Sequence, residues 1–227
     1  GLDTFSEVYL NGKLLQKTDN MFRIWKIPVK QHLISGENVL QVKFQSAINE
    51  GKKLAEKVPF TMPESPRSFV RKAQYQFGWD WGPRLVTAGI WKNVKLNFWN
   101  NAIIENVKVE QKKLTKEKAD LNIHSQIISE KEGKYTVIIN DKPFIIQLKK
   151  GKNSLQIPFI IDNPKLWQPN GSGTPNLYDL KFLLRKNKEI LSEKDLRIGL
   201  RIVELVQEKD SKGKSFYFKV NGQPLYI

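Results

Sequence analysis

One acidic side chain placed between two tryptophans is the feature of this chain best suited to chemistry. Trp79, Asp80 and Trp81 are consecutive, and Gly78 and Gly82 flank them. An indole offers a flat apolar surface to the C–H face of a sugar ring, while a fixed carboxylate accepts hydrogen bonds from the hydroxyl groups of the sugar. The residues alone are consistent with a sugar-binding loop, and a structural aspartate in a tryptophan-rich loop explains them equally well.

The carboxylate of Asp80 needs hydrogen-bond donors if the two indoles enclose it. Burying a carboxylate away from water without a partner costs several kcal/mol, so an enclosed acid is normally paired. Arg71, Lys72 and Arg84 are the nearest cationic side chains in the sequence. These three residues are therefore the candidate donors to Asp80.

Strands are expected to hold this loop, because residues of alternating polarity dominate the chain and helical patterns are scarce. In the first hundred residues the pattern predicts strands at 5–10, 13–15, 21–29, 38–44 and 90–96. The dipeptide Asn11-Gly12 after the first strand is a hairpin signal. The stretch from Ile48 to Pro66 contains several lysines and prolines and is expected to form a long irregular loop, ordered in part only beside another domain.

A second set of strands follows a boundary expected at Asn100-Asn101. The predicted strands cover residues 104–110, 119–129, 133–140, 144–148, 154–161, 177–186 and 189–205, and a hairpin with an Asn221-Gly222 turn is expected within 214–227. The period of two, clearest from Leu121 to Ile123 and from Tyr178 to Leu184, is typical of strands with one buried face. Seven strands in about 100 residues predict an immunoglobulin-like β-sandwich.

The segment from Arg71 to Arg84 resembles the signature of β-mannosidases of glycoside hydrolase family 2. Other motifs similar to that family follow in the expected order: Leu2–Gly12, Trp167–Gly171, Pro175–Tyr178, Arg197–Arg201 and Phe218–Leu225. The Trp79–Trp81 run is the most specific of them and favours mannosidases over the galactosidases and glucuronidases of the family. The other motifs indicate the family but not its substrate.

The resemblance implies an all-β chain with two sandwiches. We expect a jelly-roll, galactose-binding-like β-sandwich over residues 1–100 with its N-terminal strands missing, an immunoglobulin-like β-sandwich over 101–206, and the start of a (β/α)8 catalytic domain over 207–227. In such enzymes a similar loop reaches into the active site. The resemblance implies that Asp80 hydrogen-bonds hydroxyls of the bound mannose, that Trp79 and Trp81 shape the loop, and that Arg71 and Arg84 orient the acid.

The catalytic residues that the resemblance implies are not expected in this chain. Retaining glycosidases use two carboxylates about 5–5.5 Å apart, and in this family both are glutamates of the barrel. Asn49-Glu50 stands before the lysine-rich Gly51–Lys53 and is interpreted as solvated surface. The expected function is a non-catalytic N-terminal part of a retaining hydrolase that removes terminal β-D-mannose residues. Its partners would be a β-mannoside glycan and the missing barrel, and the piece should be inactive alone.

Two alternative functions stay open at this point. A free-standing carbohydrate-binding module would bind a glycan with the same tryptophan loop, without a barrel. Part of a β-galactosidase or β-glucuronidase of the same family would share the fold and differ in the missing pocket. A source reading frame that continues well past Ile227 would argue against the first alternative.

Composition excludes several other classes of function. The net charge of +15 comes mainly from lysine, and the lysines are interleaved with glutamates as on a solvated face, so no nucleic-acid partner is expected. No apolar run approaches the roughly 20 residues of a membrane helix. The absence of cysteine excludes disulfides and thiolate metal sites. No cofactor or metal is expected, secretion or a bacterial periplasm is compatible with the sequence, and the oligomeric state is open.

Overall fold

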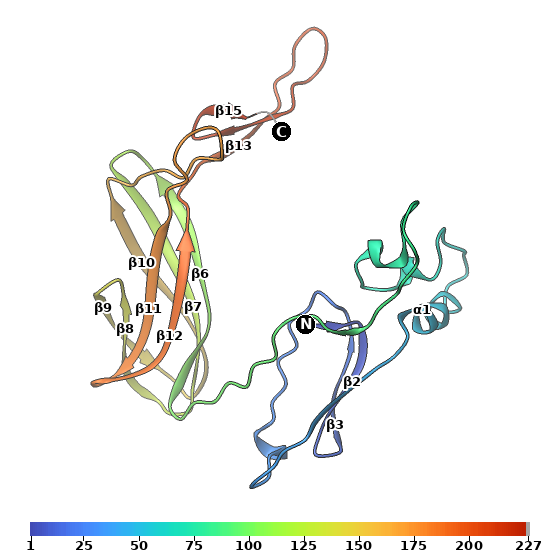
Figure 1. The fold of residues 1–227 in the computed structure, drawn as a ribbon. Coiled ribbons are helices and arrows are strands. Elements are labelled where there is room, and N and C mark those ends of the chain that lie inside the picture. Colours follow the sequence, from blue (N-terminus) through green and yellow to red (C-terminus); the bar gives the residue numbers. More distant parts are fainter. Residues whose placement is uncertain (226–227) are drawn as a thin grey trace. The chain divides into compact units, whose positions relative to one another are not determined.

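The chain divides into two compact units, Gly1–Leu96 and the part from Asn97 onward (Figure 1). This computed structural model describes residues 1–225. Strands make up most of the regular structure of both units, and α1 is the one α-helix within residues 1–225, which confirms the all-β prediction. Each unit is described by itself below.

The first unit holds a three-stranded antiparallel sheet, in the order β3-β2-β4, and a short pair of β1 with β5. Its elements are β1 (Leu2–Asp3), β2 (Phe5–Leu10), β3 (Lys13–Asp19), η1 (Lys30–His32), β4 (Leu40–Phe44), α1 (Ala47–Ala55), η2 (Arg67–Phe69), η3 (Gln74–Phe77) and β5 (Gly89–Ile90). Asn11 and Gly12 turn between β2 and β3 with φ angles of 51° and 77°. These are the positive angles of a tight hairpin turn, as the Asn-Gly signal predicts.

Two strands predicted in this unit are wrong. Residues 21–29 form no strand. Met21 is buried there, but Phe22 and Ile24 are 62% and 85% exposed. Of the strand predicted at 90–96, only Ile90 pairs, as the end of β5, and every residue from 90 to 100 is exposed. Alternating apolar residues specify a strand where another layer covers one face, and no such layer covers these segments within residues 1–225.

The irregular loop expected from Ile48 to Pro66 begins instead with the helix α1. Ser46 caps this helix, since its side-chain oxygen accepts a hydrogen bond from the Asn49 backbone N–H at 3.3 Å. Ala47 and Gly51 form the buried side of the helix. The serine cap at Ser46 thus starts a helix before the prolines that follow it interrupt regular structure.

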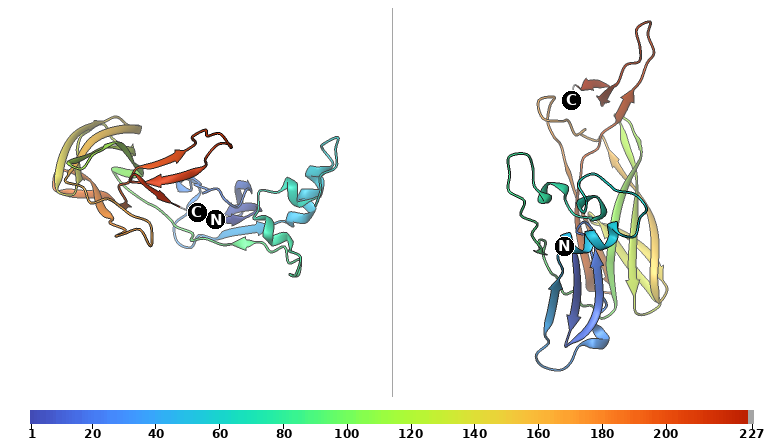
Figure 2. Two further views of the ribbon diagram at one scale, coloured as in Figure 1. Left: turned by 90° about the horizontal axis from the view of Figure 1, so that it is seen from above. Right: turned by 90° about the vertical axis from the view of Figure 1, so that its right-hand side faces the viewer.

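The second unit is a sandwich of two antiparallel sheets, with strand orders β10-β7-β6 and β12-β11-β8-β9 (Figure 2). Its strands are β6 (Ala102–Leu114), β7 (Lys118–Ser129), β8 (Gly133–Ile139), β9 (Lys142–Leu148), β10 (Gly151–Asp162), β11 (Tyr178–Lys186) and β12 (Glu189–Ile198). These seven strands lie where the alternating pattern predicts them, and they confirm the predicted immunoglobulin-like sandwich.

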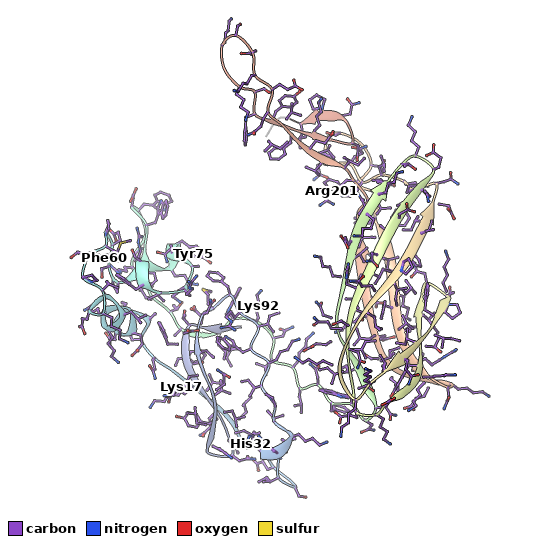
Figure 3. The ribbon with its side chains drawn as sticks, turned by 180° about the vertical axis from the view of Figure 1, so that it is seen from behind. Lys17, His32, Phe60, Tyr75, Lys92 and Arg201 are labelled. Carbon is purple, nitrogen blue, oxygen red and sulfur yellow. The ribbon has the colours of Figure 1, made fainter. Side chains whose placement is uncertain are left out.

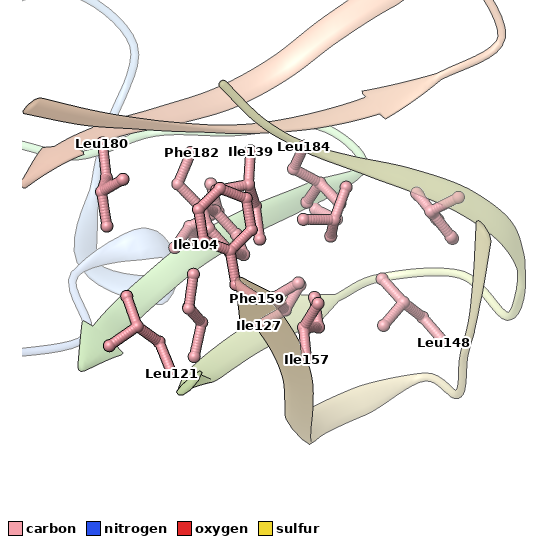
Figure 4. Close-up of a cluster of buried hydrophobic side chains, with 14 of the residues drawn as sticks. Ile104, Leu121, Ile127, Ile139, Leu148, Ile157, Phe159, Leu180, Phe182 and Leu184 are labelled. Carbon is pink, nitrogen blue, oxygen red and sulfur yellow. The ribbon is translucent and has the colours of Figure 1, made fainter. Parts of the chain in front are cut away.

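The core of this sandwich is continuous and apolar. Along β7, alternate residues from Ala119 to Ile127 are buried, with Leu121 and Ile123 between them. They face apolar side chains of the opposite sheet, such as Phe182 (Figure 4). Burying each large aliphatic or aromatic side chain contributes about 1.5–3 kcal/mol. The sheet pairing is therefore fixed by which face of each strand is apolar.

A small sheet follows the sandwich, in the order β13-β14-β15. Its strands are β13 (Val203–Val206), β14 (Tyr217–Val220) and β15 (Gln223–Leu225). Asn221 and Gly222 form the predicted hairpin turn with φ angles of 52° and 79°. The strand predicted at 189–205 is interrupted at residues 199–202. Trp167 packs there on Gly199 and donates its backbone N–H to Leu200 O at 2.8 Å. The end of the stretch expected to start a barrel, residues 226–227, lies outside the described residues.

Candidate functional site

Asp80 lies at the tip of a tight turn. The backbone N–H of Gly82 donates to Trp79 O at 3.2 Å, and Trp79 and Gly82 form an isolated antiparallel bridge, so Asp80 and Trp81 occupy the two central positions of the turn. Gly78 closes the neck of the turn with a φ of 100°, and a Cβ added there would lie 3.4 Å from Arg84 Cα. The close approach of the two chain segments at the neck therefore requires glycine.

The two indoles beside Asp80 stand in solvent. Trp79 is 58% exposed and Trp81 is 86% exposed. Their ring centroids are 6.0 Å apart with planes at 69°, an edge-to-face arrangement. Large aromatic surfaces that are exposed beside a polar group are typical of ligand sites, because their burial is completed by the ligand.

The carboxylate of Asp80 has no hydrogen-bond or ion-pair partner within the part of the chain that the structure describes, and its side chain is exposed. The indoles therefore do not enclose it, and the desolvation expected from the sequence does not occur in this structure. A hydrated and unpaired carboxylate keeps all its acceptor capacity for a ligand that donates hydrogen bonds.

The candidate donors to Asp80 lie elsewhere. Lys72 is buried and forms an ion pair with Asp3. The guanidinium of Arg84 lies over the ring of Phe77, 5.8 Å from its centroid. Arg71 is exposed, and its carbonyl accepts the backbone N–H of Met21 at 3.0 Å. The structure thus brings Trp79, Asp80 and Trp81 together at one turn but leaves the two arginines without a contact to the acid among residues 1–225.

The base of the loop packs on a small hydrophobic cluster. Phe77 is buried against Ala47 and Val70, and Val86 packs on the same cluster. These contacts fix the loop on the side of α1. Tyr75, two residues before Phe77 in η3, is mostly exposed (Figure 3).

Within residues 1–225 no group of three or more histidine, aspartate or glutamate side chains is placed to hold a metal ion. Over the same residues no helix is long and apolar enough to cross a membrane.

Two models of one family match the chain in succession. The model described as glycosyl hydrolase 2 galactose-binding domain-like matches residues 1–92, and the model of glycosyl hydrolases family 2 matches residues 93–201. The chain belongs to glycoside hydrolase family 2. The family resemblance of the sequence motifs and the galactose-binding-like class of the first domain are thereby confirmed.

Relatives of this family 2 chain include enzymes named β-mannosidase. β-Mannosidase B from Aspergillus terreus is 31% identical over 236 residues, and β-mannosidase B from Aspergillus oryzae is 33% identical over 240 residues; each alignment covers 100% of this chain and 28% of the relative. A crystal structure of β-D-mannosidase from Dictyoglomus thermophilum is 43% identical with a TM-score of 0.89, covering 99% of this chain and 29% of that one. The chain thus spans less than a third of the length of these relatives.

A more distant solved structure shares the fold alone. The exo-chitosanase from Amycolatopsis orientalis is 19% identical, with a TM-score of 0.73 over 99% of this chain and 25% of that one. The same fold therefore occurs in a protein of low sequence identity that carries a different enzyme name, and the fold by itself does not decide the substrate.

The types and spacing of residues predict the tryptophan turn but not the residues that support it. Asp80 and its flanking tryptophans were visible because their types and spacing are unusual. Asp3 and Met21, which contact the base of the loop, were missed, because each lies at least 50 residues from its partner in the chain. The one signal in the sequence is Lys72, but its position near Asp80 in the chain predicts a contact with that acid, whereas the structure pairs it with Asp3.

Proposed function

We propose that this chain is the N-terminal, non-catalytic part of a retaining glycosidase that removes terminal, non-reducing β-D-mannose residues, and that its turn at Trp79–Trp81 contacts the substrate. The observation that supports this most directly is the unpaired carboxylate of Asp80 between two exposed indoles. Sugar hydroxyls can donate to the carboxylate, while the C–H faces of the ring contact an indole. The names of the relatives favour a β-mannoside over other glycosides.

In this proposal the chain contacts the β-mannoside, and the remainder of the protein catalyses its hydrolysis. Retaining hydrolysis requires a carboxylic acid that protonates the leaving oxygen and a carboxylate that attacks the anomeric carbon, about 5–5.5 Å apart. Asp80 would hold the sugar hydroxyls so that this attack occurs in the correct orientation. Residues 1–100 and 101–206 would be the two sandwich domains, and residues from 207 onward would begin the catalytic domain.

The test is hydrolysis of an aryl β-D-mannoside and an aryl β-D-galactoside, side by side, by the full-length protein and by the 227-residue chain. We expect turnover of the mannoside by the full-length protein alone. Turnover by the 227-residue chain would mean that catalytic carboxylates lie within it. Preference for the galactoside would contradict the assignment of substrate to the tryptophan turn.

A second candidate is a carbohydrate-binding module that acts without a barrel, and the exposure of Trp81 favours it specifically. In that case the 227-residue chain alone should bind manno-oligosaccharides, with a change in tryptophan fluorescence that Trp81→Ala removes. A chain that hydrolyses nothing and binds no oligosaccharide would leave the first proposal as the better one.

A further inference from the structure

Asp3 and Lys72 form a buried ion pair that the proposed sugar contacts do not use. The side chain of Lys72 is 0% exposed and that of Asp3 is 6% exposed. The Lys72 ammonium donates to Asp3 Oδ2, and Asp3 Oδ1 accepts the hydroxyl of Thr4 at 2.6 Å. A buried charge pair is costly to desolvate, so its retention calls for a structural or functional reason.

The ammonium of Lys72 also joins the two ends of the tryptophan loop. It donates to the backbone carbonyl of Thr87 at 2.8 Å, which closes the segment 73–86 at its base. Asp3 in turn belongs to β1, which pairs with β5 in the register Asp3↔Gly89, and Gly89 lies two residues after Thr87. Lys72, the residue before the loop, thus connects with its buried ammonium to Asp3 of β1 and to Thr87, the residue after the loop.

Met21 also bonds to residues on both sides of the loop. Its backbone N–H donates to Arg71 O at 3.0 Å, before the loop, and its carbonyl accepts Trp91 Nε1 at 3.1 Å, after the loop. Its sulfur accepts the backbone N–H of Ala73 at 3.0 Å. Both entry and exit of the loop are therefore held against the β1–β3 region, whereas the turn at Trp79–Trp81 projects into solvent.

We propose that Lys72 and Asp3 are positioning residues for the tryptophan turn: their buried pair, with the Thr87 carbonyl, holds the base of the loop so that Asp80 and the indoles meet the sugar in one orientation. This inference rests on the proposed function of Asp80. A misplacement of about 1 Å at a reacting substrate can cost about 100-fold in rate. Residues at the base of the loop can therefore change the rate of the reaction without contacting the sugar.

The decisive experiment is a double-mutant cycle on kcat/KM for an aryl β-D-mannoside, in the full-length protein, with Lys72→Met and Asp80→Ala singly and together. Lys72→Met should lower kcat/KM by about 10- to 100-fold in the parent protein. In the Asp80→Ala background it should lower kcat/KM by less than about 3-fold, because residues that act as a unit are not additive. Equal losses in the two backgrounds would overturn the proposal.

The matched control is Lys17→Met. Lys17 forms an ion pair with Glu7 at 2.9 Å on the strand β3 of the same unit, but it is exposed (Figure 3). This variant should leave kcat/KM unchanged within about 2-fold in both backgrounds, as is usual for exposed pairs. If Lys72→Met does not fold, Asp3→Asn replaces it in the cycle, because the amide keeps the side-chain volume and an acceptor oxygen for the ammonium. The reduction of kcat/KM by Asp3→Asn should again disappear in the Asp80→Ala background.

Hydrogen–deuterium exchange separates failure of this inference from failure of the proposed function. Lys72→Met should accelerate exchange of the amides in 74–86 and leave the strands β6 to β12 unchanged. If the full-length protein hydrolyses no mannoside, the proposed function fails, and this local acceleration would still show that the ion pair holds the base of the loop. Unchanged exchange in 74–86 would overturn the positioning role whatever the activity.

Discussion

At the scale of the residue, two aspartates of the first unit have opposite environments. Asp3 is buried and has a cation and a hydroxyl as partners, whereas Asp80 is exposed and has no partner within residues 1–225. A satisfied buried acid rigidifies its surroundings, and an unpaired exposed acid is available to a ligand. The two aspartates therefore suit a supporting role and a binding role, respectively.

Replacing Asp80 should affect activity and not stability. In the full-length protein, Asp80→Ala should cost about 2–5 kcal/mol of transition-state stabilisation for an aryl β-D-mannoside, the range for losing a charged hydrogen-bond partner. The unfolding midpoint should stay within about 1 °C, because exposed side chains without partners contribute little to stability. Steady-state kinetics and a thermal melt check the two parts.

Asp162 provides the matched control for that variant. It is an exposed aspartate at the end of β10, remote in sequence from the loop. Asp162→Ala should change neither kinetics nor melting. If Asp80→Ala left kinetics unchanged but lowered the melting midpoint, Asp80 would return to a structural role.

Glu7 gives a prediction about pH. The Tyr9 hydroxyl donates to Glu7 Oε2 at 2.6 Å, and the Lys17 ammonium lies 2.9 Å from Oε1. The hydrogen bond from Tyr9, followed by that from Lys17, holds the pKa of Glu7 below its ordinary value of 4.5. Since the folded-state pKa is the lower one, the stabilisation is present above the unfolded pKa and is lost as pH falls through the folded pKa.

We therefore expect Glu7→Gln to lower the unfolding midpoint slightly at about pH 7 and to have a shrinking effect as the pH falls below about 4.5. Thermal melts of parent and variant across this range measure the difference. Glu204→Gln, at an exposed position of β13, is the control and should show no trend. A difference for Glu7→Gln that does not depend on pH would mean that the pair contributes nothing through ionisation.

At the scale of the element, the sequence predicts strands well where another layer covers them. The strand predicted at 119–129 is β7, Lys118–Ser129, because its buried side chains face a second sheet. The equally apolar residues 21–29 lack such a layer and form no strand. The Lys72–Asp3 pairing joins residues 69 positions apart, and no local pattern specifies a contact of that separation. Local patterns thus predict the tryptophan turn but not the contacts that support it.

The helix α1 depends on a glycine for its packing. A Cβ added to Gly51 would lie 2.8 Å from Pro66 Cβ and 2.8 Å from Val70 Cγ2. Gly51→Ala gains about 1 kcal/mol of helix propensity, but overpacking against a rigid ring costs about 1–3 kcal/mol. We expect a net loss of unfolding free energy of about 1 kcal/mol, measured by chemical denaturation.

Asn49→Ala is the control within the same helix. Asn49 is exposed and only its backbone N–H contacts the cap, so the alanine gains propensity without a clash. This variant should be neutral or slightly stabilising. If Gly51→Ala were equally stabilising, the close approach of α1 to Pro66 and Val70 would be wrong.

At the scale of the whole molecule, the two units differ in how much core they contain. The main cluster of the second unit has 16 buried residues, while the cluster around Phe77 in the first unit has three. The first unit also leaves Phe22 and Ile24 in solvent. Because buried apolar area is the main stabilising term of a domain, the second unit should be the more stable of the two.

Limited proteolysis of the 227-residue chain tests this difference. Residues 90–100 are exposed throughout and include Lys92 and Lys95, so trypsin should cut there early. We expect a resistant fragment that contains β6 to β12, identified by mass, and faster degradation of the first unit. The double variant Lys92→Gln/Lys95→Gln should delay the first cut without changing which unit survives. Proteolysis of a folded protein follows the population of its locally opened states. Early cuts within β6 to β12 would therefore contradict the prediction that the sandwich is the more stable unit.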